Sequence, residues 1–300
     1  MPVVLAAVLG LTTGTQALGS SPGGTAPAPD AGTFEATAGC GQEPTLTDGT
    51  HTVPSGRSFI LDVPDNYDSS NPYRLVLGLH WWGGTAEDVA TGRTVETGTW
   101  AYYGLQGLAD NSTIFVAPQG TDNGWANPGG EDVAFIDDIL AMIEADLCVD
   151  TSLRFSIGFS YGGAMSISLA CSRPDVFRAV VAQSSPGEIS GCDGGTEPVA
   201  YMGVHGTADN FTGGEAQRDR WVTNNGCTPQ DTPAPAAGSL THITTDYEGC
   251  SEDHPVRWAA FDEGHIAAPH DGAPGDGGDT WVPGEAWDFI TQFQPTQATP

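Results

Sequence analysis

The sequence contains no lysine, and its nine basic residues are all arginine. Against them stand 38 acidic residues, which give a formal net charge of −29 at pH 7. A surface with this charge repels nucleic-acid phosphates and anionic lipid headgroups, so the sequence argues against binding to nucleic acid or to a membrane surface. We interpret the excess of acidic residues as a solvated surface that favours solubility.

Long apolar runs are also missing. The apolar stretch at residues 3–11 is too short to span a bilayer. Together with Thr15-Gln16-Ala17, which resembles a cleavage site, it is typical of a secretory signal, although the usual basic residues before it are absent. The Gly-, Ser-, Pro- and Ala-rich residues from 17 to 33 predict a disordered linker. We therefore expect a secreted, extracellular protein in which residues 1–32 are signal and linker and residues 33–296 form one domain.

Metal-binding spacings such as Cys-x-x-Cys or His-x-x-x-His are absent, but the chain has six cysteines. An even number of cysteines beside an export signal predicts three disulfides. Cys148 precedes the strand that leads to Ser160, and Cys171 lies near the end of the helix that follows, so we expect these two to pair at one edge of the sheet. Proximity in the sequence predicts a second pair, Cys227 with Cys250. The remaining cysteines are Cys40 and Cys192.

Strand-like apolar runs alternate with helix-compatible segments from about residue 39 onward. The predicted strands are residues 57–63, 73–80, 113–117, 153–159, 178–183, 199–205 and 256–261. The predicted helices are residues 132–147, the segment from Ser160 to the stop at Arg173-Pro174, and residues 281–293. This alternation predicts an α/β fold with a mostly parallel central sheet flanked by helices. In such folds, catalytic and ligand-binding residues lie at the carboxyl ends of the strands.

The segment Gly158-Phe159-Ser160-Tyr161-Gly162 matches the pattern Gly-x-Ser-x-Gly. In a chain with 41 glycines the pattern alone is weak, so its context decides. An apolar strand precedes Ser160 and a small-residue helix follows it, which is the strand–turn–helix setting of a nucleophile elbow. The sequence therefore predicts that Ser160 is a nucleophile.

A serine nucleophile needs a histidine base and an acid that orients the histidine. Asp209 follows a predicted strand directly and is the preferred acid, with Asp246 and Asp262 as weaker alternatives. His265 follows the last predicted strand and is the preferred base, with His270 as the alternative. These choices give the chain order serine, acid, histidine.

The other histidines are assigned no catalytic role. His205 is expected to shape the Asp209 loop. His51, His242 and His254 are expected to lie in surface loops.

The tetrahedral intermediate of such a reaction needs two backbone N–H donors for its oxyanion. Tyr161, the residue after the nucleophile, is one candidate. The loop Leu79-His80-Trp81-Trp82-Gly83-Gly84 follows an early strand and supplies the other, for which we favour Trp82 over Trp81. The indoles of Trp81 and Trp82 are expected to line a cleft for an aromatic or sugar group. Trp125 is either another wall of this cleft or a packing residue.

These motifs together resemble secreted feruloyl esterases of the group that also holds polyhydroxybutyrate depolymerases and acetylxylan esterases. The resemblance covers about residues 39–293. The segments that resemble the group are Leu79-His80-Trp81-Trp82-Gly83-Gly84, Gly124-Trp125-Ala126-Asn127, Gly129-Gly130-Glu131-Asp132-Val133, Gly158-Phe159-Ser160-Tyr161-Gly162-Gly163, His205-Gly206-Thr207-Ala208-Asp209, Pro255-Val256-Arg257-Trp258 and Gly264-His265. The histidine loop departs from the group in having Glu263 where a first glycine is common.

The resemblance implies an α/β-hydrolase in which Ser160, Asp209 and His265 form the triad, Tyr161 and Trp82 serve the oxyanion, and no metal or organic cofactor takes part. It also implies an esterase that releases ferulate from feruloylated arabinoxylan or small aryl esters, and we expect it to act as a monomer. An acetylxylan or polyester hydrolase of the same group is the alternative. A secreted binding protein without catalysis is the alternative from another class.

Overall fold

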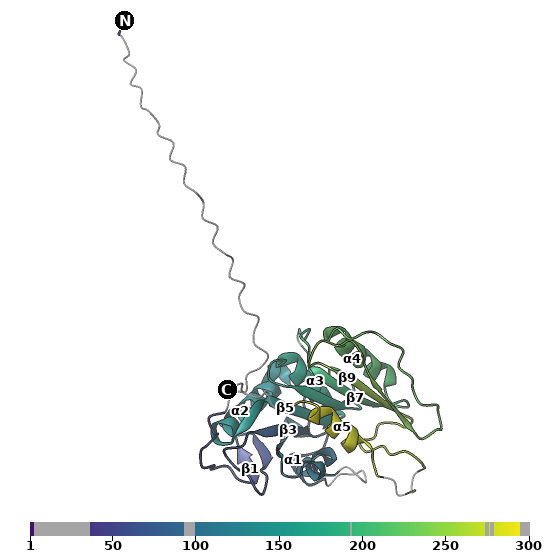
Figure 1. The fold of residues 1–300 in the computed structure, drawn as a ribbon, viewed down its shortest axis with the longest axis horizontal. Helices are drawn as coiled ribbons and strands as arrows, with labels where there is room; N and C mark the ends of the chain where they lie inside the picture. The colour runs from purple at the N-terminus through teal and green to yellow at the C-terminus, as the bar shows by residue number, and fades with distance from the viewer. Residues whose placement is uncertain (3–36, 93–99, 193, 274–275, 277–278, 295–300) are drawn as a thin grey trace. The chain divides into compact units, whose positions relative to one another are not determined.

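A nine-stranded sheet passes through the part of the chain that the computed structural model describes, which is residues 1–2, 37–92, 100–192, 194–273, 276 and 279–294 (Figure 1). The strand order is β1-β2-β4-β3-β5-β6-β7-β9-β8. The strands are β1 (Gly49–Thr52), β2 (Ser58–Asp62), β3 (Tyr73–Leu79), β4 (Thr113–Pro118), β5 (Val149–Phe159), β6 (Ala179–Gln183), β7 (Ala200–Gly206), β8 (His242–Asp246) and β9 (Val256–Phe261).

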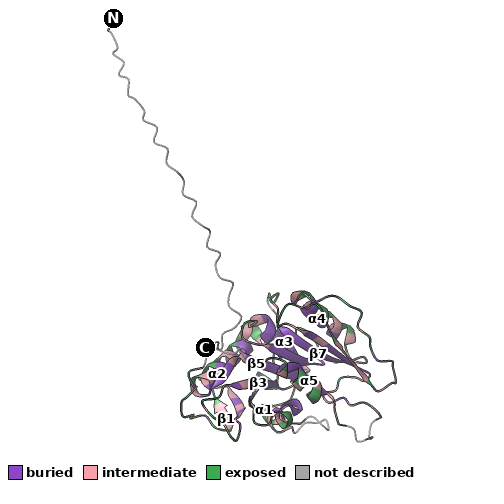
Figure 2. Cartoon of the chain, in the orientation of Figure 1, coloured by how far each residue is buried: buried purple, intermediate pink, exposed green. Residues whose placement is uncertain are grey.

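The six central strands, β4, β3, β5, β6, β7 and β9, are parallel, and β1, β2 and β8 join the sheet antiparallel at its two sides. Parallel strands are buried on both faces, and the residues of β6 and β7 are all buried, as Figure 2 shows for β7. The prediction of an α/β fold with a mostly parallel central sheet is confirmed.

Helices cover both faces of the sheet, and the sheet divides the core into two clusters of buried residues (Figure 1). The α-helices are α1 (Ala86–Thr91), α2 (Glu131–Asp146), α3 (Tyr161–Ser172), α4 (Phe211–Asn224) and α5 (Val282–Thr291), and the short 3-10 helices are η1 (Ala101–Gly104), η2 (Gln106–Leu108), η3 (Thr121–Asn123) and η4 (Pro128–Gly130). Buried side chains of α2, α3 and α4 pack into one cluster, and those of α1 and α5 into the other.

The elements with strong apolar periodicity were all predicted, and the two strands and two α-helices that were missed, like the four 3-10 helices, are polar or short. β1 and β8 are side strands with half-exposed, polar sequences, GTHT and HITTD. They contain His51 and His242, so the prediction that these histidines lie in loops is wrong. α1 has six residues, and α4 has two glycines and few apolar side chains, so neither shows a helical apolar face in the sequence.

Three disulfides are present, Cys40–Cys148, Cys171–Cys192 and Cys227–Cys250. The prediction of Cys227–Cys250 is confirmed, and the prediction of Cys148–Cys171 is wrong. The segment that contains Cys40 packs against the end of α2, where the Gly39 N–H donates to the Glu144 carbonyl at 3.1 Å, and this contact brings Cys40 beside Cys148. Cys171 instead pairs with the loop that follows β6.

The predicted signal and linker, residues 1–32, lie outside the described residues except for Met1 and Pro2. Among the residues that are described, no helix has the length and apolar character needed to cross a membrane.

Candidate active site

Ser160 lies at a strained turn between β5 and α3. Its backbone has φ 54° and ψ −118°, a region that residues with a side chain rarely adopt. The turn is held on both sides, because the Ser160 N–H donates to the Gln183 carbonyl of β6 at 2.8 Å and the Ser160 carbonyl accepts from the Ala164 N–H at 3.0 Å. Strain of this kind lifts a serine oxygen above the sheet.

Glycine is required at two positions around this turn because the backbones approach closely. A Cβ atom on Gly158 would lie 2.3 Å from the Gly162 carbonyl carbon. A Cβ atom on Gly162 would lie 2.0 Å from the Leu79 carbonyl oxygen at the end of β3. The two glycines of the Gly-x-Ser-x-Gly pattern therefore let α3 start directly against the sheet.

Ser160, His265 and Asp209 form a continuous hydrogen-bonded chain. His265 Nε2 lies 2.9 Å from Ser160 Oγ, and His265 Nδ1 lies 2.8 Å from Asp209 Oδ2. A carboxylate accepts, so Nδ1 is the protonated nitrogen, and Nε2 is left to accept the serine proton. The fold brings these groups together although 105 residues separate Ser160 from His265.

Backbone contacts lock the acid loop to the histidine loop. The Thr207 N–H donates to the Phe261 carbonyl at 2.8 Å, and the Ala208 N–H donates to the Glu263 carbonyl at 2.9 Å. Glu263, which stands where the resembling group often has a glycine, thus contributes its backbone carbonyl to this contact. The His265 ring packs against Phe159 with ring centroids 4.8 Å apart.

The Asp209 carboxylate is stabilised in its charged form. Burial raises its pKa, but hydrogen bonds from His265 and the Asn210 backbone and the two nearby histidines outweigh burial, so the pKa lies below its ordinary value. Asp209 therefore stays ionised at neutral pH and accepts the hydrogen bond from His265 Nδ1 as a carboxylate.

The alternative acids and base have other partners. Asp246 forms an ion pair with Arg257 at 2.7 Å, and Asp262 accepts from the Leu240 N–H at 3.0 Å. His270 Nδ1 lies 3.3 Å from the Asp271 carbonyl. The structure brings only Asp209 and His265, of these five candidates, to Ser160.

His80 orients the loop after β3, a role for which the sequence predicted no residue. His80 is fully buried; its Nε2 accepts from the Gly120 N–H at 2.9 Å, so its Nδ1 is the donor to the Trp81 carbonyl, also at 2.9 Å. Burial lowers the pKa of His80 to about 4, which keeps the ring neutral in this tautomer at neutral pH. In the sequence, the position of His80 directly after a buried strand is the signal that could have indicated this role.

The fixed Trp81 carbonyl sets the direction of the next N–H group. It accepts from His80 and from the Gly84 N–H at 3.0 Å, and in a trans peptide the Trp82 N–H points the opposite way. Neither the Trp82 nor the Tyr161 N–H donates to any residue in the described part of the chain. Both groups are free to bind an oxyanion.

The three tryptophans that were considered for the cleft wall lie in different surroundings. The Trp82 indole is 68% exposed and stacks on the Tyr161 ring with centroids 5.6 Å apart. Trp81 is partly buried, and its ring lies against Gly84. Trp125 is fully buried and donates to the His80 carbonyl at 2.7 Å, so it is a packing residue and its assignment to the cleft wall is corrected.

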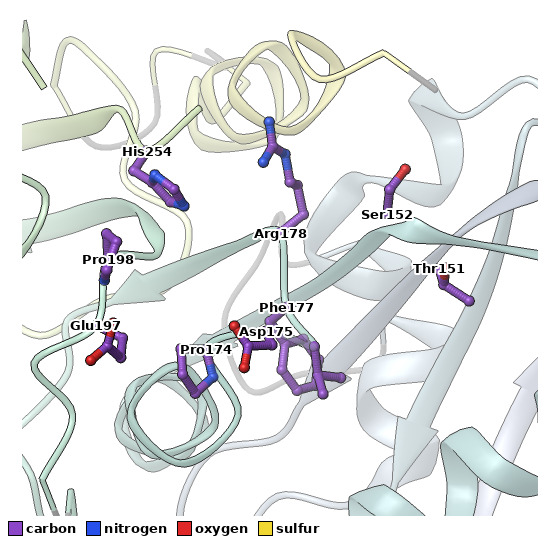
Figure 3. Close-up of a pocket in the computed structure, with 10 residues that line it drawn as sticks. Thr151, Ser152, Pro174, Asp175, Phe177, Arg178, Glu197, Pro198 and His254 are labelled. Carbon is purple, nitrogen blue, oxygen red and sulfur yellow. The ribbon is translucent and has the colours of Figure 1, made fainter. Parts of the chain in front are cut away.

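A cavity of about 490 Å³ lies at the opposite edge of the sheet, where β5 and β6 begin (Figure 3). It is lined mainly by polar side chains, among them Arg178, Glu197 and His254. Arg178 is paired with Asp253 at 2.8 Å, and His254 Nδ1 lies 3.3 Å from Ser251 Oγ. Within the described ranges, no group of three or more His, Cys, Asp or Glu side chains could hold a metal ion.

Comparison with known proteins identifies the relatives of this chain. No protein-family model matches it. Feruloyl esterase C of Emericella nidulans is 48% identical over 255 residues, which cover 84% of this chain and 90% of that protein. The chain belongs to the feruloyl esterase family. Feruloyl esterase D of Neurospora crassa, another member, is 41% identical over 264 residues, 85% of this chain and 90% of that protein.

A solved structure shares the fold of this family member. A mutant feruloyl esterase module from Clostridium thermocellum in complex with sinapinate superimposes with a TM-score of 0.55 and 12% sequence identity. The match covers 90% of this chain and 99% of that module. At this identity it supports the α/β-hydrolase fold alone.

Proposed function

We propose that this protein is a secreted serine carboxylic-ester hydrolase that releases hydroxycinnamates such as ferulate from esterified plant cell-wall polysaccharide. The observation that supports the chemistry best is the hydrogen-bonded chain from Ser160 through His265 to Asp209. The observation that supports the substrate class is the 48% identity to feruloyl esterase C over most of both chains. The three disulfides are consistent with an extracellular enzyme.

In the first half of the reaction, Ser160 Oγ attacks the ester carbonyl carbon and its proton passes to His265 Nε2. The carbonyl oxygen becomes an oxyanion, which the Trp82 and Tyr161 N–H groups stabilise. The C–O bond to the sugar then breaks, and the leaving alkoxide takes the proton from His265. The product at this stage is an acyl-enzyme with the hydroxycinnamoyl group on Ser160.

In the second half, water attacks the acyl carbonyl and gives its proton to His265. The intermediate collapses, Ser160 Oγ leaves with that proton, and the free acid departs. Asp209 stays ionised throughout, because its pKa lies below its ordinary value, and it holds His265 with Nδ1 protonated.

An exposed aromatic surface supports an aryl acyl group. Trp82 and Tyr161 each offer a backbone N–H to the oxyanion, and their stacked rings form a continuous aromatic surface beside that position. The Trp82 ring is 68% exposed, so a flat hydroxycinnamoyl ring can stack on it. A polyester hydrolase is expected to need a broad apolar surface, whereas the described domain exposes only four large apolar side chains: Trp82, Trp100, Leu108 and Ile189.

The test compares the purified protein with its Ser160→Ala variant on methyl ferulate, p-nitrophenyl acetate and de-starched wheat bran. Ser172→Ala, at the end of the same helix, is the matched control. We expect the wild type and the control to release ferulate from both the ester and the bran. We expect Ser160→Ala to lose at least ~10⁴-fold in kcat.

Cleavage of the acetate ester without ferulate release would keep the serine mechanism but move the substrate to acetylated xylan or a polyester. Equal rates in the wild type and Ser160→Ala would overturn the nucleophile. Retained ligand binding with no hydrolysis by either protein would favour the binding-protein alternative.

A further inference from the structure

A second histidine contacts the candidate catalytic acid. His205 Nε2 lies 3.4 Å from Asp209 Oδ2, the same oxygen that accepts from His265 Nδ1 at 2.8 Å. His205 is 2% exposed, and its Nε2 has no hydrogen-bond partner among the described residues. A buried polar atom without a partner is costly unless a nearby charge compensates it, and the Asp209 carboxylate is that charge.

The His205 ring is held in place by packing on several sides. Its ring stacks on Trp258 of β9 with centroids 6.0 Å apart and 15° between the planes, and Phe211 lies 6.4 Å away. Gly214 of α4 is so close that a Cβ atom there would lie 2.7 Å from His205 Cγ. The ring therefore cannot turn away from Asp209 without displacing α4 or β9.

The groups around His205 favour its neutral form. Burial lowers its pKa, and His265 lowers it further, whereas the Asp209 carboxylate and the Asn210 backbone oppose this. The net pKa lies below the ordinary value. From α4, the Arg218 guanidinium lies over the Trp258 ring, 5.3 Å from its centroid.

The neutral ring has two tautomers, and the carboxylate distinguishes them. With the proton on Nε2, the N–H dipole faces Asp209 Oδ2 and attracts it. With the proton on Nδ1, a lone pair would face the carboxylate at 3.4 Å and repel it. Of the two tautomers, the Asp209 carboxylate therefore favours the one with the proton on Nε2.

We propose that His205 is a positioning residue for the reaction: its Nε2–H holds the ionised Asp209 carboxylate in line with His265 while His265 gains and loses the serine proton. The inference rests on the proposed function, since it concerns the same triad. Because His205 is neutral, it fixes the position of the Asp209 carboxylate and leaves its negative charge intact. That charge stabilises the imidazolium of His265 during the reaction. A cation in its place would weaken that charge.

The test uses two variants of similar size. His205→Met removes the donor and keeps most of the volume. His205→Gln keeps an N–H donor at about the same reach. With methyl ferulate we expect kcat of His205→Met to fall ~10-fold with KM within about twofold, and kcat of His205→Gln to recover to within about threefold of the wild type. His254→Met, a half-buried histidine at the opposite edge of the sheet, is the matched control and should leave both parameters unchanged.

The tautomer can be measured in the wild type, which keeps the inference testable even if His205→Met does not fold. Long-range ¹H–¹⁵N correlation spectra of the imidazoles, assigned by the signal that His205→Gln lacks, should show a neutral ring protonated on Nε2 at pH 7. A ring protonated on Nδ1 would overturn the inference, as would a His205→Met enzyme with unchanged kcat. Equal rates of ester hydrolysis in the wild type and in Ser160→Ala would instead overturn the proposed function, so the two failures are distinguishable.

Discussion

At the scale of single residues, the candidate site combines one exposed histidine with two buried ones. The side chain of His265 is 41% exposed, whereas His80 and His205 are buried and neutral. The sequence predicted Ser160, Asp209 and His265, because each directly follows an apolar strand. It assigned no role to His80, because the direction of one carbonyl cannot be read from residue types.

The buried His80 predicts a dependence of stability on pH. Its pKa is about 4 in the folded protein and about 6.5 in the unfolded chain, so folding loses stability as the pH falls from 6.5 toward 4. We expect this residue to contribute a loss of about 2 kcal/mol in the free energy of unfolding between pH 7 and pH 4.5.

Urea denaturation of the wild type and of His80→Asn at the two pH values measures this loss. Asn keeps a donor for the Trp81 carbonyl but does not titrate. Carboxylates that titrate in the same range affect both proteins and cancel in the comparison. An equal pH dependence in the two proteins would contradict the assignment of a neutral, buried His80.

At the scale of elements, the junction of β3, β5 and α3 determines whether Ser160 is presented correctly. A Cβ atom on Gly162 would lie 2.0 Å from the Leu79 carbonyl oxygen. That carbonyl is backbone and cannot move aside alone. The sequence predicted this turn from its glycines, but the close approach of β3, more than 80 residues earlier, is a tertiary contact.

We therefore expect Gly162→Ala to lower the free energy of unfolding by about 2 kcal/mol and to reduce kcat, because the helix must shift at Ser160. Gly284→Ala is the matched control, since Gly284 lies in the first turn of α5 with nothing within 4 Å of its Cβ position. The control should be neutral or more stable by up to about 1 kcal/mol. Thermal melts and kcat on methyl ferulate measure both effects, and an active, stable Gly162→Ala enzyme would refute the close contact.

At the scale of the whole molecule, the disulfides join distant parts of the chain. Cys40–Cys148 spans 108 residues, whereas Cys227–Cys250 spans 23. In the chain-entropy view, the longer loop restricts the unfolded chain more. We expect Cys40→Ser with Cys148→Ser to cost about 5 kcal/mol, and Cys227→Ser with Cys250→Ser about 3 kcal/mol.

Urea denaturation of the two double variants, each beside the wild type, measures these costs. If removal of the short bridge cost as much as removal of the long one, loop entropy would not be the main source of the stabilisation. Activity should persist in both variants under conditions where they are folded, because neither bridge contacts Ser160, Asp209 or His265.

The sequence by itself determined the fold class and the order of the main elements, and it predicted the three residues that we propose as the triad. Apolar periodicity is a local property, and polar residues that follow buried strands must gather at one edge of a parallel sheet. Only the tertiary structure decided the pairing of Cys148, the burial of Trp125, the orienting role of His80 and the contact of His205 with Asp209. Each depends on which segments approach one another in space, and that follows from packing across the sheet rather than from neighbours along the chain.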